Sequence, residues 1–115
     1  MNFNLPSFQP PDIKFKDDAD SIVEDILDAV NNFNNNLDDE HEVGIILTSF
    51  GQTVTLNITG IGYQGDKLVR LVGYLSENGN PVELIQHVTQ TNLLFAAIPR
   101  ENPEEPKKEI GFIQS

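Results

Sequence analysis

The sequence predicts an α+β domain in which one N-terminal helix precedes a five-stranded, strongly bent antiparallel sheet. Apolar residues between residues 22 and 37 recur at helical spacing, whereas from Val43 onward the apolar pattern has a period of two. Links of turn length between the apolar runs favour antiparallel pairing. Because the chain has 115 residues, it has room for one domain with a single core.

The predicted helix is amphipathic and begins at a capping box formed by Ser21 and Glu24. Asp17, Asp18 and Asp20 lie next to this start, where negative charge suits the positive end of the helix dipole. Asparagines at 31, 32 and 34–36 weaken the last turns, since Asn favours caps and turns. The apolar stripe comprises Ile22, Val23, Ile26, Leu27, Val30, Phe33 and Leu37.

Five segments are expected as strands of an antiparallel meander that curls where glycines permit. Glycines at 60, 62 and 65 interrupt the alternation that precedes them, which indicates a bulge or a sharp bend. Asn78-Gly79 supplies a hairpin turn because both residues tolerate positive φ. The expected strands are 42–50, 53–59, 67–75, 82–90 and 93–98.

The domain, residues 18–99, is expected to carry a segment at each end. Residues 1–17 contain three prolines and favour an extended arm, whose apolar residues would pack on this domain or on a neighbouring copy. Residues 100–115 form a charged tail with an apolar end at Ile110-Gly111-Phe112-Ile113, which suggests docking.

The charge is strongly acidic and uneven. The chain has 18 acidic and 7 basic residues, and residues 1–42 hold 11 of the acids with 2 of the bases. A surface of this kind repels phosphate backbones, so we expect no binding of duplex DNA. The acidic face either meets a basic protein surface or serves solubility.

Several classes of protein are excluded by what the sequence lacks. The absence of cysteine excludes disulfides, a thiolate nucleophile and cysteine zinc sites. No apolar run reaches the roughly 18 residues of a membrane span, and the first residues lack the features of a secretory signal, so we expect a cytoplasmic protein without membrane contact. No Walker, GxGxxG or HExxH motif is present, so no cofactor is expected.

Neither histidine indicates catalysis or a metal centre. His41 lies among the carboxylates of residues 38–42, but consecutive residues of an extended chain point in opposite directions, so a solvated connection is expected rather than a metal site. His87 has no nucleophile partner in the sequence pattern and is expected to be structural or to contact a ligand. The acids Asp66, Glu77 and Glu83 are scattered over the strand half, so we expect no enzyme.

If a ligand site exists, polar side chains of the strand half are expected to form it, within one chain or across a subunit boundary. Tyr63 would stack on a base while amides read its edges. Arg70 and Arg100 would each pair with an acid or reach a phosphate. The expected ligand-binding residues are Tyr63, Gln64, Arg70, His87, Gln90, Asn92 and Arg100.

The order of one helix and five bent strands resembles the Sm-like proteins. The segment Thr91-Asn92-Leu93-Leu94-Phe95-Ala96-Ala97-Ile98-Pro99 is similar to the second Sm signature and the strand that follows it. Thr91 and Asn92 stand where the bacterial signature has a Lys-His pair. The resemblance implies a small open barrel that assembles into rings, and it implies a topology more than an activity.

Four blocks are also similar to an uncharacterised family of small bacterial and phage proteins. They are residues 39–44, 49–54, 61–63 and 84–90. This resemblance implies a domain of unknown function that is often encoded among mobile elements.

These observations lead to one main hypothesis and two alternatives. The main one is a non-catalytic, homo-oligomeric binding protein of phage or mobile-element type that sequesters a small, nucleotide-like ligand and thereby counters bacterial defence. The first alternative is an acidic inhibitor that covers a basic surface of a partner protein, as a nucleic-acid mimic does. The second is an Sm-like RNA-binding protein, which would require a basic patch.

Overall fold

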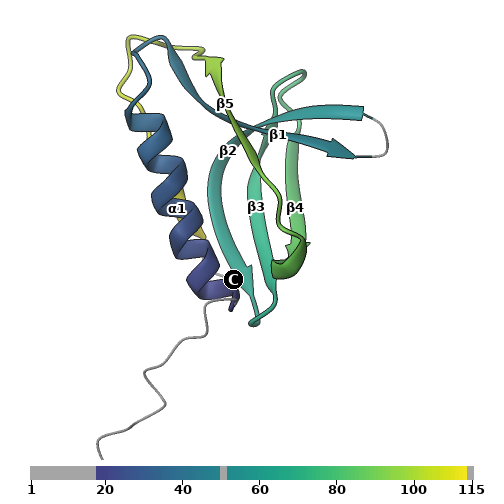
Figure 1. The fold of residues 1–115 in the computed structure, drawn as a ribbon. Coiled ribbons are helices and arrows are strands. Elements are labelled where there is room, and N and C mark those ends of the chain that lie inside the picture. Colours follow the sequence, from purple (N-terminus) through teal and green to yellow (C-terminus); the bar gives the residue numbers. More distant parts are fainter. Residues whose placement is uncertain (1–17, 50–51, 114–115) are drawn as a thin grey trace, which may run out of the picture.

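The computed structural model describes residues 18–49 and 52–113, so the expected arm at residues 1–17 lies outside the described residues. One helix precedes the strands (Figure 1), which confirms the α+β class. The elements are α1 (Ala19–Asn35), β1 (His41–Ser49), β2 (Gln52–Gln64), β3 (Leu68–Leu75), β4 (Pro81–His87), the 3₁₀ helix η2 (Val88–Gln90), β5 (Leu94–Pro99) and β6 (Gly111–Ile113).

The start of α1 differs from the predicted capping box. The N-cap is Asp18, whose side chain makes no capping hydrogen bond, so the prediction that Ser21 caps the helix is wrong. Ala19 is fully buried, and its N–H donates to the carbonyl of Asp66 in the β2–β3 turn at 3.0 Å. A hydrogen bond to a distant turn therefore fixes the start of the helix, which residue spacing alone does not reveal.

The apolar face of α1 is the one that the spacing predicts. Val23 and Val30 are fully buried in the core, and Ile22, Ile26, Leu27 and Phe33 pack against it. The ring of Phe33 meets that of Phe95 on β5 edge to face, with centroids 5.7 Å apart. The helix therefore contributes the predicted stripe to the core except for Leu37, which lies beyond the helix end at Asn35 and outside the core cluster.

The sheet has the strand order β4-β3-β2-β1-β5, and β6 pairs with β2 off this path. Strands β1 to β4 form the expected antiparallel meander, but β5 pairs with β1 instead of β4. A Cβ on Gly44 would lie 2.9 Å from Cδ1 of Ile98, so the glycine makes room for β5 on this side. The prediction of a continuous five-strand meander is thus wrong for its last strand.

Strand β2 is sharply bent, as the glycines indicate. Its register against β3 shifts between Ile58 and Gly60, which is a β-bulge. A Cβ at Gly73 on β3 would collide with the carbonyl of Asn57, so the two backbones approach more closely than any side chain permits. Beyond the bulge, β2 leaves β1 and pairs in parallel with β6 at Gly60–Gly62.

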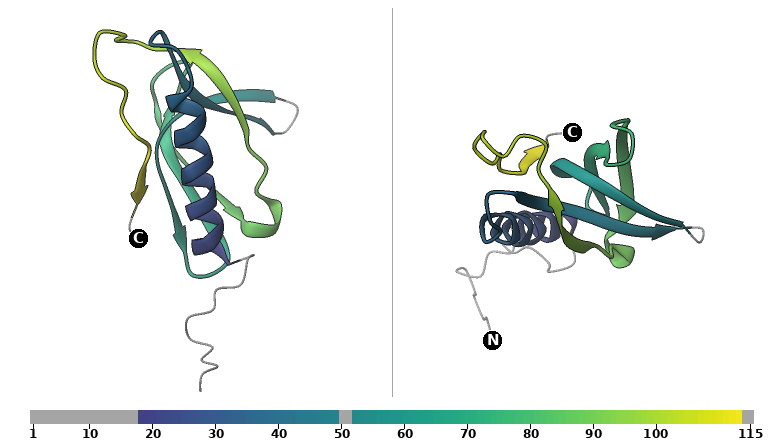
Figure 2. Two further views of the ribbon diagram at one scale, coloured as in Figure 1. Left: turned by 60° about the vertical axis from the view of Figure 1, so that its left-hand side comes forward. Right: turned by 90° about the horizontal axis from the view of Figure 1, so that it is seen from above.

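The segment after β5 docks along α1 and β2, where Figure 2 shows it beside both. The amide of Asn31 donates to the carbonyl of Ile110 at 3.1 Å and accepts from its N–H at 2.9 Å. Lys107 Nζ donates to the carbonyls of Asn34 and Leu37 at 2.8 and 2.9 Å, at the negative end of the helix. The docking expected for residues 110–113 is confirmed.

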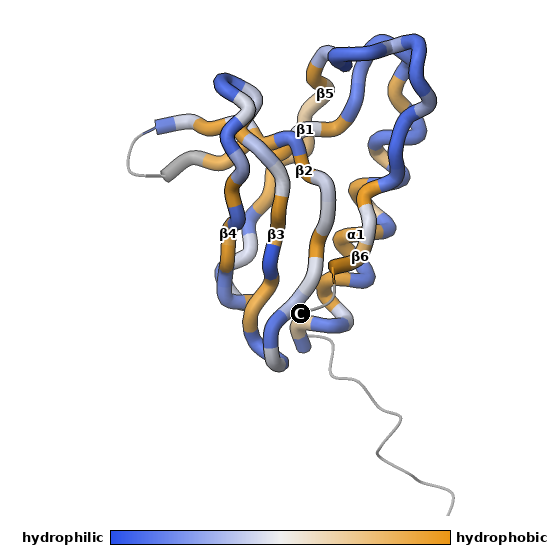
Figure 3. The backbone as a smooth tube through the Cα atoms, turned by 180° about the vertical axis from the view of Figure 1, so that it is seen from behind, coloured by the Kyte–Doolittle hydropathy of each residue, from blue (hydrophilic) through white to orange (hydrophobic). Residues whose placement is uncertain are grey.

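Two details of the predicted sheet need correction. The strand expected at residues 82–90 ends at His87, because Val88–Gln90 form the 3₁₀ helix η2. The count of five strands is wrong, because the docked end adds β6. Its three residues follow a segment that is hydrophilic over most of its length (Figure 3), so no alternation marks it. Within residues 18–49 and 52–113, β4 and β5 do not pair, so the sheet is open and the Sm-like barrel stays a prediction.

Replacing Asn34 by Ala tests the link between the asparagine-rich helix end and the sheet. Asn34 is 3% exposed, and its Oδ1 accepts from the N–H of Val43 at 2.9 Å. The substitution leaves that buried N–H without an acceptor, so we expect the free energy of unfolding in urea to fall by about 1–3 kcal/mol. Asn35→Ala, at an exposed position of the same helix, should change it by less than about 0.5 kcal/mol. Equal losses in the two variants would contradict the assigned role.

Candidate functional site

At least two hollows lie among residues 18–49 and 52–113. The first, of about 330 Å³, is a cleft between α1, β2 and the segment after β5, here called the cleft. The second, of about 380 Å³, lies between β4 and β5 where the sheet is open, here called the groove. The cleft is lined mainly by polar side chains and the groove by apolar and amide side chains.

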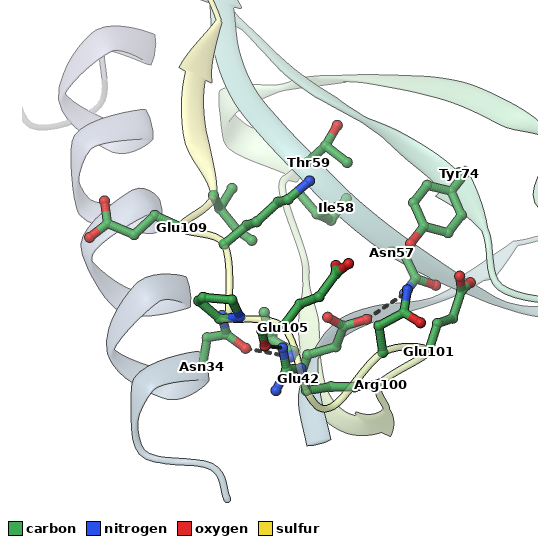
Figure 4. A pocket seen from close by; sticks show the side chains of 15 residues that line it. Asn34, Glu42, Asn57, Ile58, Thr59, Tyr74, Arg100, Glu101, Glu105 and Glu109 are labelled. Carbon is green, nitrogen blue, oxygen red and sulfur yellow. Dashed lines mark hydrogen bonds between the residues drawn. The ribbon is translucent and has the colours of Figure 1, made fainter. Parts of the chain in front are cut away.

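The bulge in β2 builds one wall of the cleft. Asn57 precedes the register shift and is 8% exposed, although its neighbours Leu56 and Ile58 are core residues. Its Nδ2 donates to Oε2 of Glu42 at 3.2 Å, and its Oδ1 accepts from the hydroxyl of Ser76. Tyr74 is the register partner of Asn57 on β3. Figure 4 shows Glu42, Asn57 and Tyr74 together on the sheet side of the cleft.

The opposite wall comes from the docked segment, and Arg100 shapes it. The guanidinium of Arg100 donates to the carbonyls of Asp39 and Pro103 at 2.8 and 3.2 Å, and to the carbonyl of Glu105. Its backbone N–H donates to Glu40. Arg100 therefore folds the segment around itself, and these bonds leave its side chain engaged with backbone rather than with a ligand.

Carboxylates outnumber cations around the cleft. Glu42, Glu101, Glu105 and Glu109 line it together with Arg100 and Lys108. The pKa of the Tyr74 hydroxyl is raised above its ordinary value of 10.0, first by burial and then by the charges of Glu101 and Glu42. The cleft thus disfavours added negative charge and offers carboxylate and amide oxygens to hydrogen-bond donors.

The titration of Tyr74 tests the acidic character of the cleft. The chain has two tyrosines and no tryptophan, so Tyr63→Phe leaves Tyr74 as the single phenol for ultraviolet titration. We expect a pKa above 10.0 that moves down when Glu101 is changed to Gln, because one repelling charge is removed. Since folding raises this pKa, its contribution to stability is present below pH 10 and is lost as the pH rises through the folded value.

Glu104 provides the matched control for this titration. It is exposed and does not line the cleft, so Glu104→Gln should leave the pKa of Tyr74 unchanged. A pKa at or below 10.0 in the folded protein would contradict the described surroundings of the phenol.

The groove brings together two of the predicted ligand-binding residues and adds a third amide. Gln90 and Asn92 line it with Gln86, while Ile46, Leu47, Leu84 and Leu94 form its apolar part. Oε1 of Gln86 is buried and has no hydrogen-bond partner in the described part of the chain. The sequence analysis did not include Gln86 among the site residues, although the alternation of the strand could have identified it. Gln86 lies two residues after Leu84, so both side chains point to the same, inward face of β4.

The other predicted site residues do not join Gln90 and Asn92: Arg100 lines the cleft, and Tyr63, Gln64, Arg70 and His87 line neither hollow. Arg70 pairs with Glu83 at 2.6 Å, so it has the first of its two predicted roles, an ion pair with an acid. Nδ1 of His87 lies 2.8 Å from the hydroxyl of Thr89 and accepts from its backbone N–H, so the ring caps η2. Tyr63 packs on Phe112, with ring centroids 5.7 Å apart. Gln64 is exposed at the end of β2.

His41 is the first residue of β1, so it follows the helix-to-strand connection in which its sequence context predicts it. Its Nδ1 lies 2.7 Å from Oδ1 of the exposed Asp38. The contact with His41, followed by the N–H of Glu40, holds the pKa of the Asp38 carboxyl below its usual value. Histidine, aspartate and glutamate side chains of residues 18–49 and 52–113 form no group of three that would hold a metal ion.

Comparison with known proteins identifies the family of the chain. Residues 11–113 match a family of unknown function, DUF6173, and the chain belongs to this family. The searches of curated proteins and of solved structures gave no match. In the part of the chain that the structure describes, no helix has the length and apolar character needed to cross a membrane.

Proposed function

We propose that the protein is a non-catalytic binding protein that holds a small, nucleotide-like ligand by its base in the cleft. The observation that carries the proposal is the convergence of Glu42, Asn57 and Tyr74, from three strands, on one wall of a cleft of about 330 Å³. Hydrogen bonds from Ser76 to Asn57 and from Asn57 to Glu42 fix two of these groups before a ligand enters. Preorganised polar groups of this kind confer orientation and specificity on a small-molecule site.

The charges of the cleft suggest which end of a nucleotide enters. A carboxylate such as Glu42 accepts hydrogen bonds from ring N–H and exocyclic amino groups, and a guanine presents both on one edge. The ring of Tyr74 offers a flat surface for the base. Phosphates are repelled by the carboxylates of the wall and would stay at the mouth, where Lys108 contributes an ammonium group.

The side chains that line the cleft favour binding of a ligand over its chemical conversion. Its hydroxyl groups come from Thr59 and Tyr74, and neither histidine of the chain lines it. Among the residues that line the cleft, no hydroxyl group therefore has a histidine base beside it. Binding without reaction would sequester the ligand, and sequestration of a nucleotide signal of bacterial defence is the physiological form of this proposal.

We extend the proposal to assembly into a homo-oligomer. Ile85 on β4 and Phe112 on β6 are large apolar side chains that are 48% and 50% exposed. Burial of such side chains against a second copy is favourable. The first helix, the bent strands and the pairing of β5 with β1 support an Sm-like architecture for each subunit.

The affinity for guanosine monophosphate, measured by calorimetry beside adenosine monophosphate, tests the proposal. We expect the guanine nucleotide to bind more tightly and Glu42→Gln to weaken it by at least about tenfold, because one charged acceptor is lost. Native mass spectrometry of the same sample gives the number of subunits and any copurified ligand. Absence of binding for both nucleotides would contradict the proposal.

Two control variants separate the cleft from the acidic helix. Glu40→Gln removes a neighbouring exposed carboxylate that does not line the cleft, and it should leave the affinity unchanged. Asp25 and Asp28 are exposed on α1, which favours the alternative function of an acidic inhibitor of a basic partner. If the double variant Asp25→Asn with Asp28→Asn no longer binds a basic partner protein, and the natural chain binds no nucleotide, the inhibitor function replaces the sequestration function.

A further inference from the structure

The open side of the sheet leaves two strand edges unpaired. Among the described residues, β4 pairs with β3 alone and β5 with β1 alone. Leu94, which faces the groove between them, is 60% exposed. Unpaired N–H and C=O groups along an edge are a template for a further strand.

The residues that line the groove indicate the chemistry of the segment that would fill it. Ile46, Leu84 and Leu94 offer an apolar wall, and the buried Oε1 of Gln86 has no donor in the described part of the chain. An unsatisfied buried acceptor costs free energy, so the occupant should bring an N–H group. An extended segment with apolar side chains on one face supplies both the N–H group and the apolar contact.

Residues 12–16 of this chain have that pattern. Ile13 and Phe15 alternate with Lys14 and Lys16, which is the period of a strand. The match to the family covers residues 11–113, so this segment lies inside the family match. Phe3 and Leu5 lie outside it and serve below as a comparison.

The start of α1 is linked to one end of the groove through the β2–β3 turn. Ala19 N–H bonds to Asp66, and the next residue, Lys67, accepts a hydrogen bond from Val88 at 2.8 Å. Val88 opens the 3₁₀ helix η2, which carries Gln90 of the groove. Five residues in a strand span about 16 Å, so residues 12–16 are long enough to run along most of β4.

We propose that residues 12–16 add to the free edge of β4 in their own chain and fill the groove. Ile13 and Phe15 face Ile46, Leu84 and Leu94, and a backbone N–H donates to Oε1 of Gln86. The added strand covers an edge that otherwise invites aggregation, and it extends the sheet without using the cleft.

Hydrogen exchange of the full chain tests this placement. In Ile13→Ser with Phe15→Ser, we expect amides of β4 to exchange at least about tenfold faster, while those of α1 change little. Phe3→Ser with Leu5→Ser is the matched control and should leave β4 protected as in the natural chain. Unchanged exchange of β4 in the first variant, or equal effects of the two variants, would overturn the proposal.

A disulfide experiment tests the same placement if the serine substitutions destabilise the whole domain and so make hydrogen exchange uninformative. Because the chain has no cysteine, Phe15→Cys with Leu94→Cys introduces one pair. We expect this pair to form an intramolecular disulfide at least about fivefold faster than Lys14→Cys with Leu94→Cys, whose first side chain points away from the groove. A faster Lys14 pair, or a disulfide that joins two chains, would refute docking within one chain.

Discussion

The bend in β2 is the constraint on which the rest of the structure depends. A 13-residue strand cannot pair along its whole length with β1 and also follow the core, so it shifts register between Ile58 and Gly60 and turns away. This turn frees the far half of its edge for β6 and places Asn57 at the wall of the cleft. The close crossing at Gly73 is what permits the bend, because a side chain there would meet the backbone of Asn57.

The asparagines at the end of α1 connect this bent strand to the rest of the chain. Asn31 holds the backbone of Ile110, Asn34 holds that of Val43, and Lys107 covers the last carbonyls of the helix. Each bond joins residues that are far apart in sequence or at the start of a strand. The segment after β5 is thereby fixed against the helix, and the cleft between them acquires two walls instead of one.

Periodicity predicted the elements that bury their own apolar residues. The stripe of α1 and the alternation of the strands from residue 42 onward each repeat often enough to be recognised, and Asn78-Gly79 marked the β3–β4 turn, where Gly79 has φ of 77°. Strand β6 was missed because its three residues gain their pairing only from the edge that the bulge frees.

The site was harder to predict for the same reason. Residue types in the strand half pointed to Arg70, His87 and Arg100, whose side chains meet Glu83, Thr89 and backbone carbonyls in the folded chain. Glu42, Asn57 and Tyr74 come from three strands, and the register across the bulge brings them together. The spacing of residues within one strand does not determine how that strand is paired with its neighbours. The sequence therefore indicates which residues are polar but not which of them meet in the folded chain.

The close crossing at Gly73 is tested most directly by the free energy of unfolding of Gly73→Ala, measured beside that of Gly111→Ala. A Cβ at Gly111 meets nothing within 4 Å, so it serves as a glycine of the same sheet without a close crossing. We expect Gly73→Ala to lower the free energy of unfolding by about 1–3 kcal/mol and Gly111→Ala to change it by less than about 0.5 kcal/mol. If Gly73→Ala is as stable as the natural chain, the close crossing at the bend does not exist in solution, and the cleft built on it fails with it.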